Sequence, residues 1–302
     1  MSLTRPPGAV TRPDGAGVAL AAVLRTARPR QWLKNLLVFA APAAAGTLLD
    51  PAVGGRALWT LAVFVLASAS TYFVNDARDV EADRKHPVKC RRPVAAGLLR
   101  PRTAMAVGVA LALLAPVLAL PLGWRLVAVV AGYLGLTFSY SFGLKNQPVL
   151  DILAVAAGFV LRAVAGGVAT GVPLSNWFLL VVLFGSLFLV TAKRAAEERR
   201  GDPATRATLG AYPPGWLPQI VTMSLTGVVL TYATWALQQV TDDGSVPLAL
   251  SVVPFLAVLL RYSLLTAQGD GEEPETVLTS DRFLLVAGAL WAVLVGGALY
   301  VL

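Results

Sequence analysis

Residues 57–75, ALWTLAVFVLASASTYFVN, form an apolar run without a single charged side chain. About 20 residues of helix cross the ~30 Å hydrocarbon layer of a bilayer, so this run is long enough for one transmembrane helix. Similar runs recur, and none shows the period-two alternation of a transmembrane β-strand. The sequence therefore predicts an all-α integral membrane protein with nine transmembrane helices, at residues 32–49, 57–75, 103–121, 124–143, 148–170, 174–192, 216–239, 247–265 and 283–302.

The composition of the whole chain agrees with a protein dissolved in a bilayer. Of 302 residues, 56% are hydrophobic and 14% are charged, and the mean hydropathy is +0.68, which excludes an ordinary water-soluble enzyme. In a membrane protein, the net charge of +8 indicates cytoplasmic loops and anionic substrates, not nucleic acid. A single cysteine, Cys90, excludes an intrachain disulfide, and a single histidine, His86, disfavours a histidine metal site or a Ser-His-Asp triad.

The distribution of Lys and Arg predicts the orientation, because these residues are retained on the cytoplasmic side. With the N-terminus inside, only Arg56 and Arg125 fall outside, and Arg162 lies within a helix. We therefore expect a multi-pass protein of the cell inner (plasma) membrane with a cytoplasmic N-terminus. Residues 1–30 are expected to form a disordered start leading into a short interfacial helix, and residues 31–302 a single transmembrane domain. The sequence is compatible with a homo-oligomer.

An acidic segment, Asn75-Asp76-x-x-Asp79-x-x-x-Asp83, follows the run 57–75. If the helix continues, the three aspartates share one face, with Asn75 at its edge and Glu81 roughly opposite. Crowded carboxylates repel one another unless a cation lies among them, and hard divalent cations prefer oxygen ligands. Because Mg²⁺ usually shares its site with substrate phosphates, the segment predicts half of a diphosphate site.

Basic residues follow this segment and recur at a later cytoplasmic helix end. The run from Arg84 to Arg92 is either a solvated positive-inside loop or a set of ligands for phosphate oxygens. Between 193 and 202, Lys193 with Glu197 and Arg194 with Glu198 have the i,i+4 spacing of helix-surface ion pairs. These residues either brace a helix end or form a second substrate-binding loop, and the sequence leaves both readings open.

Two ionisable residues, Asp151 and Arg162, occupy the predicted helix 148–170. They are separated by about 20° around the helix and roughly 16 Å along its axis. A charge at that depth is costly and normally faces the protein interior. The pair therefore either lines a polar cavity or is satisfied by another helix, and Tyr140 with Lys145 would add donors at the same cytoplasmic mouth.

The acidic segment, followed by Lys89, Arg92-Pro93 and Gly97, resembles the first signature of the UbiA superfamily of intramembrane prenyltransferases. The resemblance extends over the chain, through Tyr140 and Lys145 and the charged loop after the sixth predicted helix. It implies a UbiA-type helical bundle around a central cavity that opens to lipid, with cytoplasmic cap loops that bind a diphosphate through Mg²⁺. Its typical members carry a second aspartate-rich motif, whereas this chain has Lys193, Arg194, Glu197 and Glu198 there.

That departure, the start Arg28-Pro-Arg30-Gln-Trp32-x-Lys34-Asn35 and the stretch Arg162-Ala-x-Ala-Gly-Gly resemble the phosphoribose-transferring branch of the family. The resemblance implies transfer of 5-phosphoribose from phosphoribosyl diphosphate to a polyprenyl (decaprenyl) phosphate, for arabinan synthesis in the bacterial cell wall. Two rivals remain: a prenyltransferase acting on an aromatic acceptor, and an organic-anion transporter. The expected metal ligands, of which the aspartates are also the catalytic residues, are Asn75, Asp76, Asp79 and Asp83. The expected substrate-binding residues are Lys34, Lys85, Lys89, Arg92, Tyr140, Lys145, Asp151, Arg162, Lys193 and Arg194.

Overall fold

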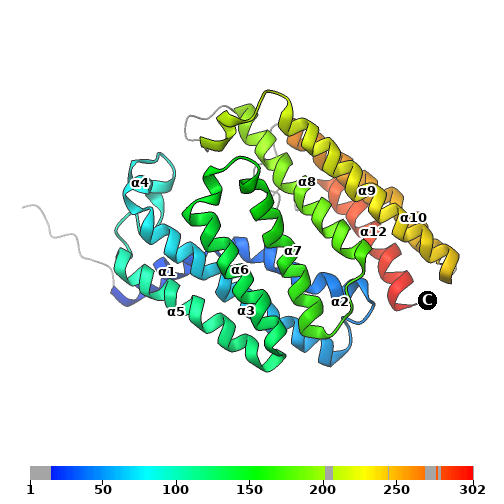
Figure 1. The fold of residues 1–302 in the computed structure, drawn as a ribbon, viewed down its shortest axis with the longest axis horizontal. Helices are drawn as coiled ribbons and strands as arrows, with labels where there is room; N and C mark the ends of the chain where they lie inside the picture. The colour runs from blue at the N-terminus through cyan, green and yellow to red at the C-terminus, as the bar shows by residue number, and fades with distance from the viewer. Residues whose placement is uncertain (1–14, 201–206, 244, 269–276, 278–279, 302) are drawn as a thin grey trace, which may run out of the picture.

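The computed structural model describes residues 15–200, 207–243, 245–268, 277 and 280–301, and this part of the chain is helical without a β-strand (Figure 1). Eight of its helices are long and apolar enough to cross a bilayer. The prediction of an all-α, multi-pass membrane protein is therefore confirmed. The eight helices are α3 (Pro51–Arg78), α5 (Pro101–Ala119), α6 (Trp124–Phe142), α7 (Leu150–Thr170), α8 (Asn176–Arg200), α9 (Trp216–Asp243), α10 (Val246–Gln268) and α12 (Arg282–Tyr300).

The predicted count of nine is not confirmed, because the stretch 32–49 is not a span-length α-helix in the described chain. It consists of a 3-10 helix, η1 (Pro29–Phe39), followed by the short α2 (Ala40–Ala44). At 2.0 and 1.5 Å per residue these two pieces cover roughly 30 Å together. The segment still runs between the two ends of the bundle, since Arg28 just before it contacts Asp76 at one end and Ala43 accepts a hydrogen bond from Tyr300 at the other.

The long helices form two groups, with α3, α5, α6 and α7 in one and α8, α9, α10 and α12 in the other (Figure 1). Contacts between α7 and α8 join the groups. The first group packs around Phe64, Leu126 and Tyr133, and the second has a core around Phe188 and Tyr262. Small residues permit the close helix contacts typical of membrane bundles, and the two groups leave room between them for the cavity described below.

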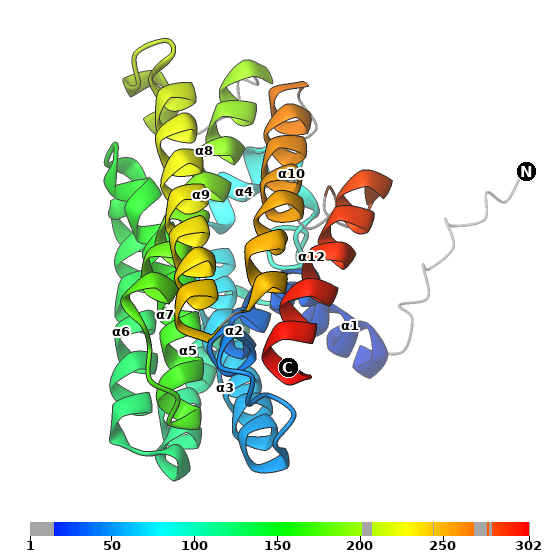
Figure 2. The ribbon, with the colours of Figure 1, turned by 90° about the vertical axis from the view of Figure 1, so that its right-hand side faces the viewer.

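The up-and-down course of the chain brings the charged connections to one end of the bundle (Figure 2). The elements at this end are α4 (Val80–Lys85) and η2 (Lys89–Arg91) after α3, η4 (Leu144–Asn146) before α7, and η5 (Ala207–Ala211) before α9. These short elements connect successive hydrophobic helices, and they hold the charged side chains at the end of the bundle. The acidic segment, Lys145 and the charged end of α8 therefore share one end of the molecule.

The N-terminal helix α1 (Gly15–Ala27) packs its buried residues Ala22 and Ala27 against α3 and exposes Leu20 and Leu24. Residues 1–14, the first part of the predicted disordered start, lie outside the described residues. A helix with an exposed apolar edge, with Arg25 in its last turn and Arg30 just after it, suits the bilayer interface. The interfacial role of this segment and the division of the chain at residue 31 stay predictions.

Candidate active site

A cavity of about 1400 Å³ lies between the two groups of helices. Its deep part is apolar, with side chains from η1, α7, α8, α9 and α10 lining it, among them Phe39, Phe159, Val182, Val228 and Phe255. Its mouth, at the charged end of the bundle, is lined by polar side chains from η1, α3, α4, η2, α6, η4 and α8. Of the residues predicted from the sequence, ten line this cavity: Lys34, Asn75, Asp79, Asp83, Lys89, Arg92, Tyr140, Lys145, Lys193 and Arg194.

The prediction that the three aspartates share one face assumed a continuous helix. The acidic segment is instead divided between two helices. Helix α3 ends at Arg78 and α4 begins at Val80, with Asp79 between them at φ −89° and ψ 12°. The N–H groups of Asp79 and Asp83 still donate to the carbonyls four residues earlier, so the direction of the chain changes little. Glu81 points away and pairs with Arg84 in solvent, as expected from its position on the helix.

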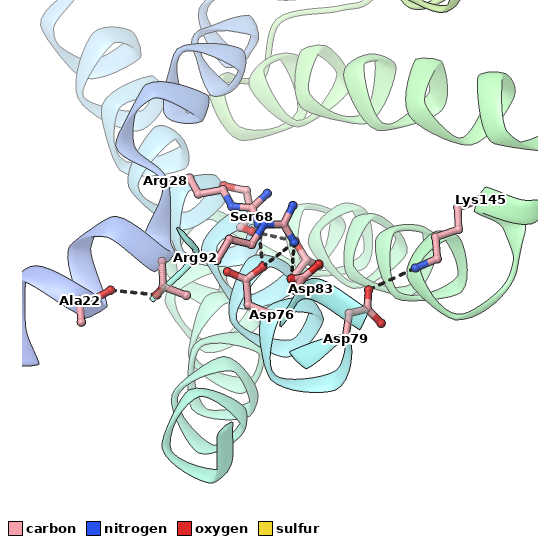
Figure 3. A network of polar contacts seen from close by, with 10 residues as sticks. Ala22, Arg28, Ser68, Asp76, Asp79, Asp83, Arg92 and Lys145 are labelled. Carbon is pink, nitrogen blue, oxygen red and sulfur yellow. Dashed lines mark hydrogen bonds and ion pairs between the residues drawn. The ribbon is translucent and has the colours of Figure 1, made fainter. Parts of the chain in front are cut away.

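Two aspartates of the segment, Asp76 and Asp83, share one cation, Arg92 (Figure 3). A nitrogen of Arg92 lies 2.7 Å from an Asp83 carboxylate oxygen and 3.3 Å from an Asp76 oxygen. The guanidinium of Arg28 lies 2.6 Å from the same oxygen of Asp76 and covers the ring of Tyr72. The Asp76 side chain is 1% exposed and does not line the cavity, whereas Asp83 does. The seven-residue spacing thus brings Asp76 and Asp83 to one side, with Asp76 as the inner member.

Asp79 points toward a different partner. Its carboxylate lies 3.3 Å from the ammonium of Lys145 in η4, which comes from the other side of the mouth (Figure 3). Arg78 holds the end of α3 against the end of α6, since its guanidinium donates to the Ser141 carbonyl at 3.1 Å and stacks over the ring of Phe142. Both side chains of the Asp79 pair are one-third exposed, so each can turn to a ligand in the cavity.

The end of α8 supplies a third wall of the mouth, with Lys193, Arg194 and Glu197 lining it. The predicted i,i+4 pair of Arg194 with Glu198 is wrong: Arg194 instead pairs with Glu197 at 3.0 Å, an i,i+3 contact. The reason is that Asp151 lies 3.4 Å from the Arg194 Nε atom and draws the side chain inward, where it is 3% exposed. Of the two readings left open above, the cavity lining favours a substrate-binding wall.

Asp151 does not line the cavity but lies beside it, where it contacts Arg194 and Tyr212. Its fully buried carboxylate accepts a hydrogen bond of 2.6 Å from the Tyr212 hydroxyl. Tyr212 in turn accepts from the N–H of Val149 at 2.7 Å, and Val149 has a φ of +69° that a β-branched residue adopts only when its surroundings hold it. Burial, with the bond to Asp151, raises the pKa of Tyr212 to about 12, so the hydroxyl stays protonated and donates.

Asp151→Asn is expected to destabilise the protein, because the buried Arg194 guanidinium would lose its fully buried carboxylate and keep Glu197. Leaving a buried charge wholly unpaired costs about 3 kcal/mol or more, so with Glu197 still in place we expect a loss of about 2 kcal/mol. The midpoint of thermal unfolding in detergent should fall by several degrees. Glu81→Gln, which neutralises an exposed carboxylate, is the matched control. Equal midpoints for the two variants would show that Asp151 does not hold Arg194.

The structure places two other predicted binding residues outside the cavity lining. Lys85 is exposed at the end of α4, so the expectation that it binds substrate is not supported by its position. Arg162 is buried and satisfied by hydrogen bonds to Asn35, Gly158 and Tyr133. The alternative left open for Arg162 and Asp151, charges satisfied by other parts of the protein, is the one that the contacts favour.

Arg28 and His86 are among the residues at the mouth that were not predicted from the sequence. Arg28 lines the cavity and adopts a left-handed conformation, with φ +53°, between α1 and η1; no local pattern predicts that turn. As the single histidine, His86 gave no indication of a site in the sequence, yet it lines the cavity. Its Nδ1 atom accepts from the N–H groups of Val88 and Lys89 at 3.2 and 3.3 Å, so it shapes the basic loop.

The donor set can be tested against the predicted Mg²⁺. Within the described ranges, no group of three or more Asp, Glu, His or Cys side chains is arranged to hold a metal ion. Mg²⁺, however, is usually held by one or two carboxylates, with waters and substrate phosphates completing its octahedron. Asp79 and Asp83, with Asn75, offer such oxygens to the cavity, and their cationic partners Lys145 and Arg92 are partly exposed. The residues therefore fit Mg²⁺ that arrives together with a phosphorylated substrate.

Similarity to known proteins extends over nearly the whole chain. Residues 36–287 match the UbiA prenyltransferase family. The chain is 43% identical over 297 residues to the decaprenyl-phosphate phosphoribosyltransferase of Corynebacterium glutamicum, covering 93% of this chain and 87% of that protein. It is also 43% identical to the Mycobacterium tuberculosis protein of that name, with 96% and 97% covered. A UbiA homologue from Archaeoglobus fulgidus, solved with DMAPP and Mg²⁺, shares the fold, with a TM-score of 0.69 at 20% identity over 93% of this chain and 99% of that one.

Proposed function

Because the chain belongs to the UbiA prenyltransferase family, we propose that its cavity transfers 5-phosphoribose from phosphoribosyl diphosphate to a polyprenyl phosphate such as decaprenyl phosphate. Membership of the family and the 43% identical relatives make the protein a membrane-embedded transferase. The observation that carries the choice of substrates is the wall at the end of α8, which has two basic side chains beside Glu197. Lys193 and Arg194 line the mouth there, where the family resemblance leads one to expect aspartates.

The charges at the mouth suit the proposed pair of substrates. Phosphoribosyl diphosphate brings a 5-phosphate and a diphosphate, and the lipid brings a further phosphate, so the site must hold several anionic groups close together. Lys and Arg bind phosphate oxygens through charge-assisted hydrogen bonds, and seven of them line the cavity: Arg28, Lys34, Lys89, Arg92, Lys145, Lys193 and Arg194. The apolar interior around Phe159 and Phe255 offers the polyprenyl chain a hydrophobic surface.

The reaction exchanges one bond at the ribose C1 atom for another. The bond from C1 to the diphosphate breaks, a bond from C1 to an oxygen of the lipid phosphate forms, and diphosphate leaves. A phosphate monoester is mostly ionised at pH 7, so the acceptor requires positioning more than a general base. Among the described residues, His86 is the sole histidine and is engaged by two backbone N–H groups, in agreement with a mechanism that needs no histidine base.

Asp79, Asp83 and Asn75 would hold Mg²⁺, and the bound ion would neutralise negative charge that develops on the leaving diphosphate. The residues of the chain do the rest. Arg92 and Lys145 move from the carboxylates that they now contact to phosphate oxygens, and the carboxylates near C1 tolerate the positive charge that develops on the ribose. Lys193 and Arg194 hold the anionic groups from the opposite wall, and the buried carboxylate of Asp151 fixes Arg194 there.

The proposal includes the location of the reaction. The basic connections gather at the mouth of the cavity, and the positive-inside tendency puts that end, with the N-terminus, on the cytoplasmic side of the plasma membrane. Phosphoribosyl diphosphate is a water-soluble anion that would enter from this side, while the lipid would enter from the bilayer. The product would be a precursor for arabinan in the bacterial cell wall.

A transfer assay tests the function. Purified protein is incubated with Mg²⁺ and either of two substrate pairs: phosphoribosyl diphosphate with decaprenyl phosphate, or a polyprenyl diphosphate with an aromatic acid. We expect a phosphoribosylated lipid from the first pair, and none after EDTA removes the metal. Prenylation of the aromatic acid without any product from the first pair would overturn the proposal in favour of a prenyltransferase.

A further inference from the structure

The segment Pro29–Phe39, called the strap from here on, is a 3-10 helix of 11 residues that forms one wall of the cavity. A 3-10 helix of more than three or four residues is uncommon, because its hydrogen bonds have poor geometry and its side chains eclipse one another. The strap brings Gln31 and Lys34 to the mouth, and Leu36 and Leu37 to the apolar part of the cavity. Its conformation and place must therefore depend on contacts with the rest of the protein.

Asn35 is the point at which the strap is fixed. Its side chain is fully buried, on the side of the strap away from the cavity. Its amide donates to the Ser68 hydroxyl on α3 at 3.1 Å, and its carbonyl accepts from the Arg162 Nε atom on α7 at 2.7 Å. Ser68 lies about two helical turns before Asp76. Asn35 therefore ties the strap to the same helix that carries the acidic segment, and sets its position relative to those carboxylates.

Arg162 braces this point from the other side. One terminal nitrogen donates to the Tyr133 hydroxyl on α6 at 2.7 Å, and the other donates to the Gly158 carbonyl at 2.8 Å. The guanidinium also lies over the Tyr133 ring. In the described part of the chain no carboxylate pairs with it, so a buried charge in the middle of a span is held by neutral acceptors from three elements. Only a planar, forked cation makes such divergent bonds, and retaining one at this depth is costly without a role.

Gly166, one helical turn after Arg162, lets the strap come close enough for these bonds. A Cβ atom at this position would collide with the backbone carbonyl of Val38 in the strap, which cannot move aside as a flexible side chain could. At the neighbouring Gly167 the three atoms nearest to a Cβ would be two side-chain atoms of Leu174 and the carbonyl oxygen of Val172, both residues after the end of α7 and neither in the strap. The stretch 162–167 is thus a docking surface on α7, in which only one of the two glycines faces the strap.

We propose that Arg162 and Gly166 are positioning residues, which hold the strap through Asn35 and Val38 so that its cavity face lines the path of the lipid substrate. This inference rests on the proposed function for its kinetic consequence. Because the strap contributes Leu36 and Leu37 to the apolar cavity while α3, α4 and α8 carry most charges of the mouth, a displaced strap weakens lipid binding first. For Gly166→Ala we expect the KM for polyprenyl phosphate to rise by about tenfold, with the KM for phosphoribosyl diphosphate changed by less than about twofold.

Distances between two spin labels measure the position of the strap directly and do not depend on which reaction the protein catalyses. Spin labels are attached at Arg30→Cys in the strap and at Leu153→Cys on α7, both exposed and outside the cavity lining, in a Cys90→Ser background. Pulsed EPR then gives the distribution of distances between the labels. We expect a shifted or broadened distribution for Gly166→Ala and Arg162→Met, and the parent distribution for Gly167→Ala.

A second pair of variants keeps the test decisive if Arg162→Met does not fold. Asn35→Asp retains an oxygen acceptor for Arg162, and the Ser68 hydroxyl, which now donates to the Val65 carbonyl, can turn to donate to the second carboxylate oxygen. This variant should therefore preserve both the distances and the lipid KM, whereas Asn35→Leu should shift both. Parent distances in Gly166→Ala and Asn35→Leu would overturn the inference, even in a fully active enzyme. Shifted distances in a protein that never transfers phosphoribose would support the brace and instead refute the proposed function.

Discussion

Asp79→Ala and Asp83→Ala should each reduce phosphoribosyl transfer by a factor on the order of 10³ while the protein remains folded in detergent. Both carboxylates line the cavity and would hold the Mg²⁺ that stabilises the leaving diphosphate. Each substitution also removes a carboxylate partner from a cation, Lys145 or Arg92, but Arg92 keeps Asp76 and solvent reaches both cations at the mouth. The effect should therefore fall on catalysis more than on folding, and initial rates with labelled phosphoribosyl diphosphate measure it.

Glu81→Ala is the matched control for this prediction. Glu81 belongs to the same acidic segment, but its side chain is 76% exposed and its ion-pair partner among the described residues is Arg84, so its removal should leave the rate within about twofold. Mn²⁺ binding, followed by EPR in the presence of diphosphate, separates a metal defect from a general one. Near-normal turnover in both aspartate variants would refute the assignment of Asp79 and Asp83 as metal ligands.

Arg92→Met should separate stability, metal affinity and turnover. Arg92 now neutralises two carboxylates that are 1% and 6% exposed, so without it the metal-free protein should lose about 2 kcal/mol, a value reduced because Arg92 itself is 29% exposed. Since the guanidinium competes for the carboxylate oxygens, Mn²⁺ should bind roughly tenfold more tightly in its absence. Turnover should nonetheless fall by roughly 10²-fold, because a phosphate ligand is gone.

Two comparisons check the Arg92 prediction. Arg91→Met removes the adjacent cation, which is exposed and outside the cavity lining, and should leave unfolding, Mn²⁺ affinity and turnover almost unchanged. Saturating Mn²⁺ should restore much of the thermal stability of Arg92→Met, because a ligand of the folded state stabilises it by mass action. Weaker Mn²⁺ binding in Arg92→Met than in the parent would contradict the view that Arg92 and the metal share the same oxygens.

The helical spans could be predicted from the sequence because hydrocarbon thickness sets their length and apolar side chains fill it. The stretch 32–49 was the exception. Its apolar content predicted a ninth helix, but tertiary contacts of Asn35 and a close approach to Gly166 hold it as a 3-10 strap. The contacts with Arg162 and Gly166 join residues more than a hundred positions apart, and the contact with Ser68 joins residues 33 positions apart. None of them leaves a local pattern, so the strap could not have been predicted from periodicity.

The candidate site shows the same division. Lys89, Lys145 and Lys193 could be predicted to share one mouth, because helix ends on one side of a membrane gather there. Which charges reach the cavity could not be predicted, because that depends on the direction of each side chain. Arg162 points into a buried hydrogen-bond network, and Arg28 reaches the mouth because its own backbone is left-handed.

The most direct test of the proposed transfer follows two labels in one reaction. Phosphoribosyl diphosphate carries ¹⁴C in the ribose and ³²P in the β-phosphate, and the protein is supplied with decaprenyl phosphate and Mg²⁺. We expect ¹⁴C in the extracted lipid and ³²P as free diphosphate in the aqueous phase, in equal molar amounts, with neither formed by Asp83→Ala. Both labels remaining in phosphoribosyl diphosphate, while the same preparation releases diphosphate from a polyprenyl diphosphate, would contradict the proposed transfer.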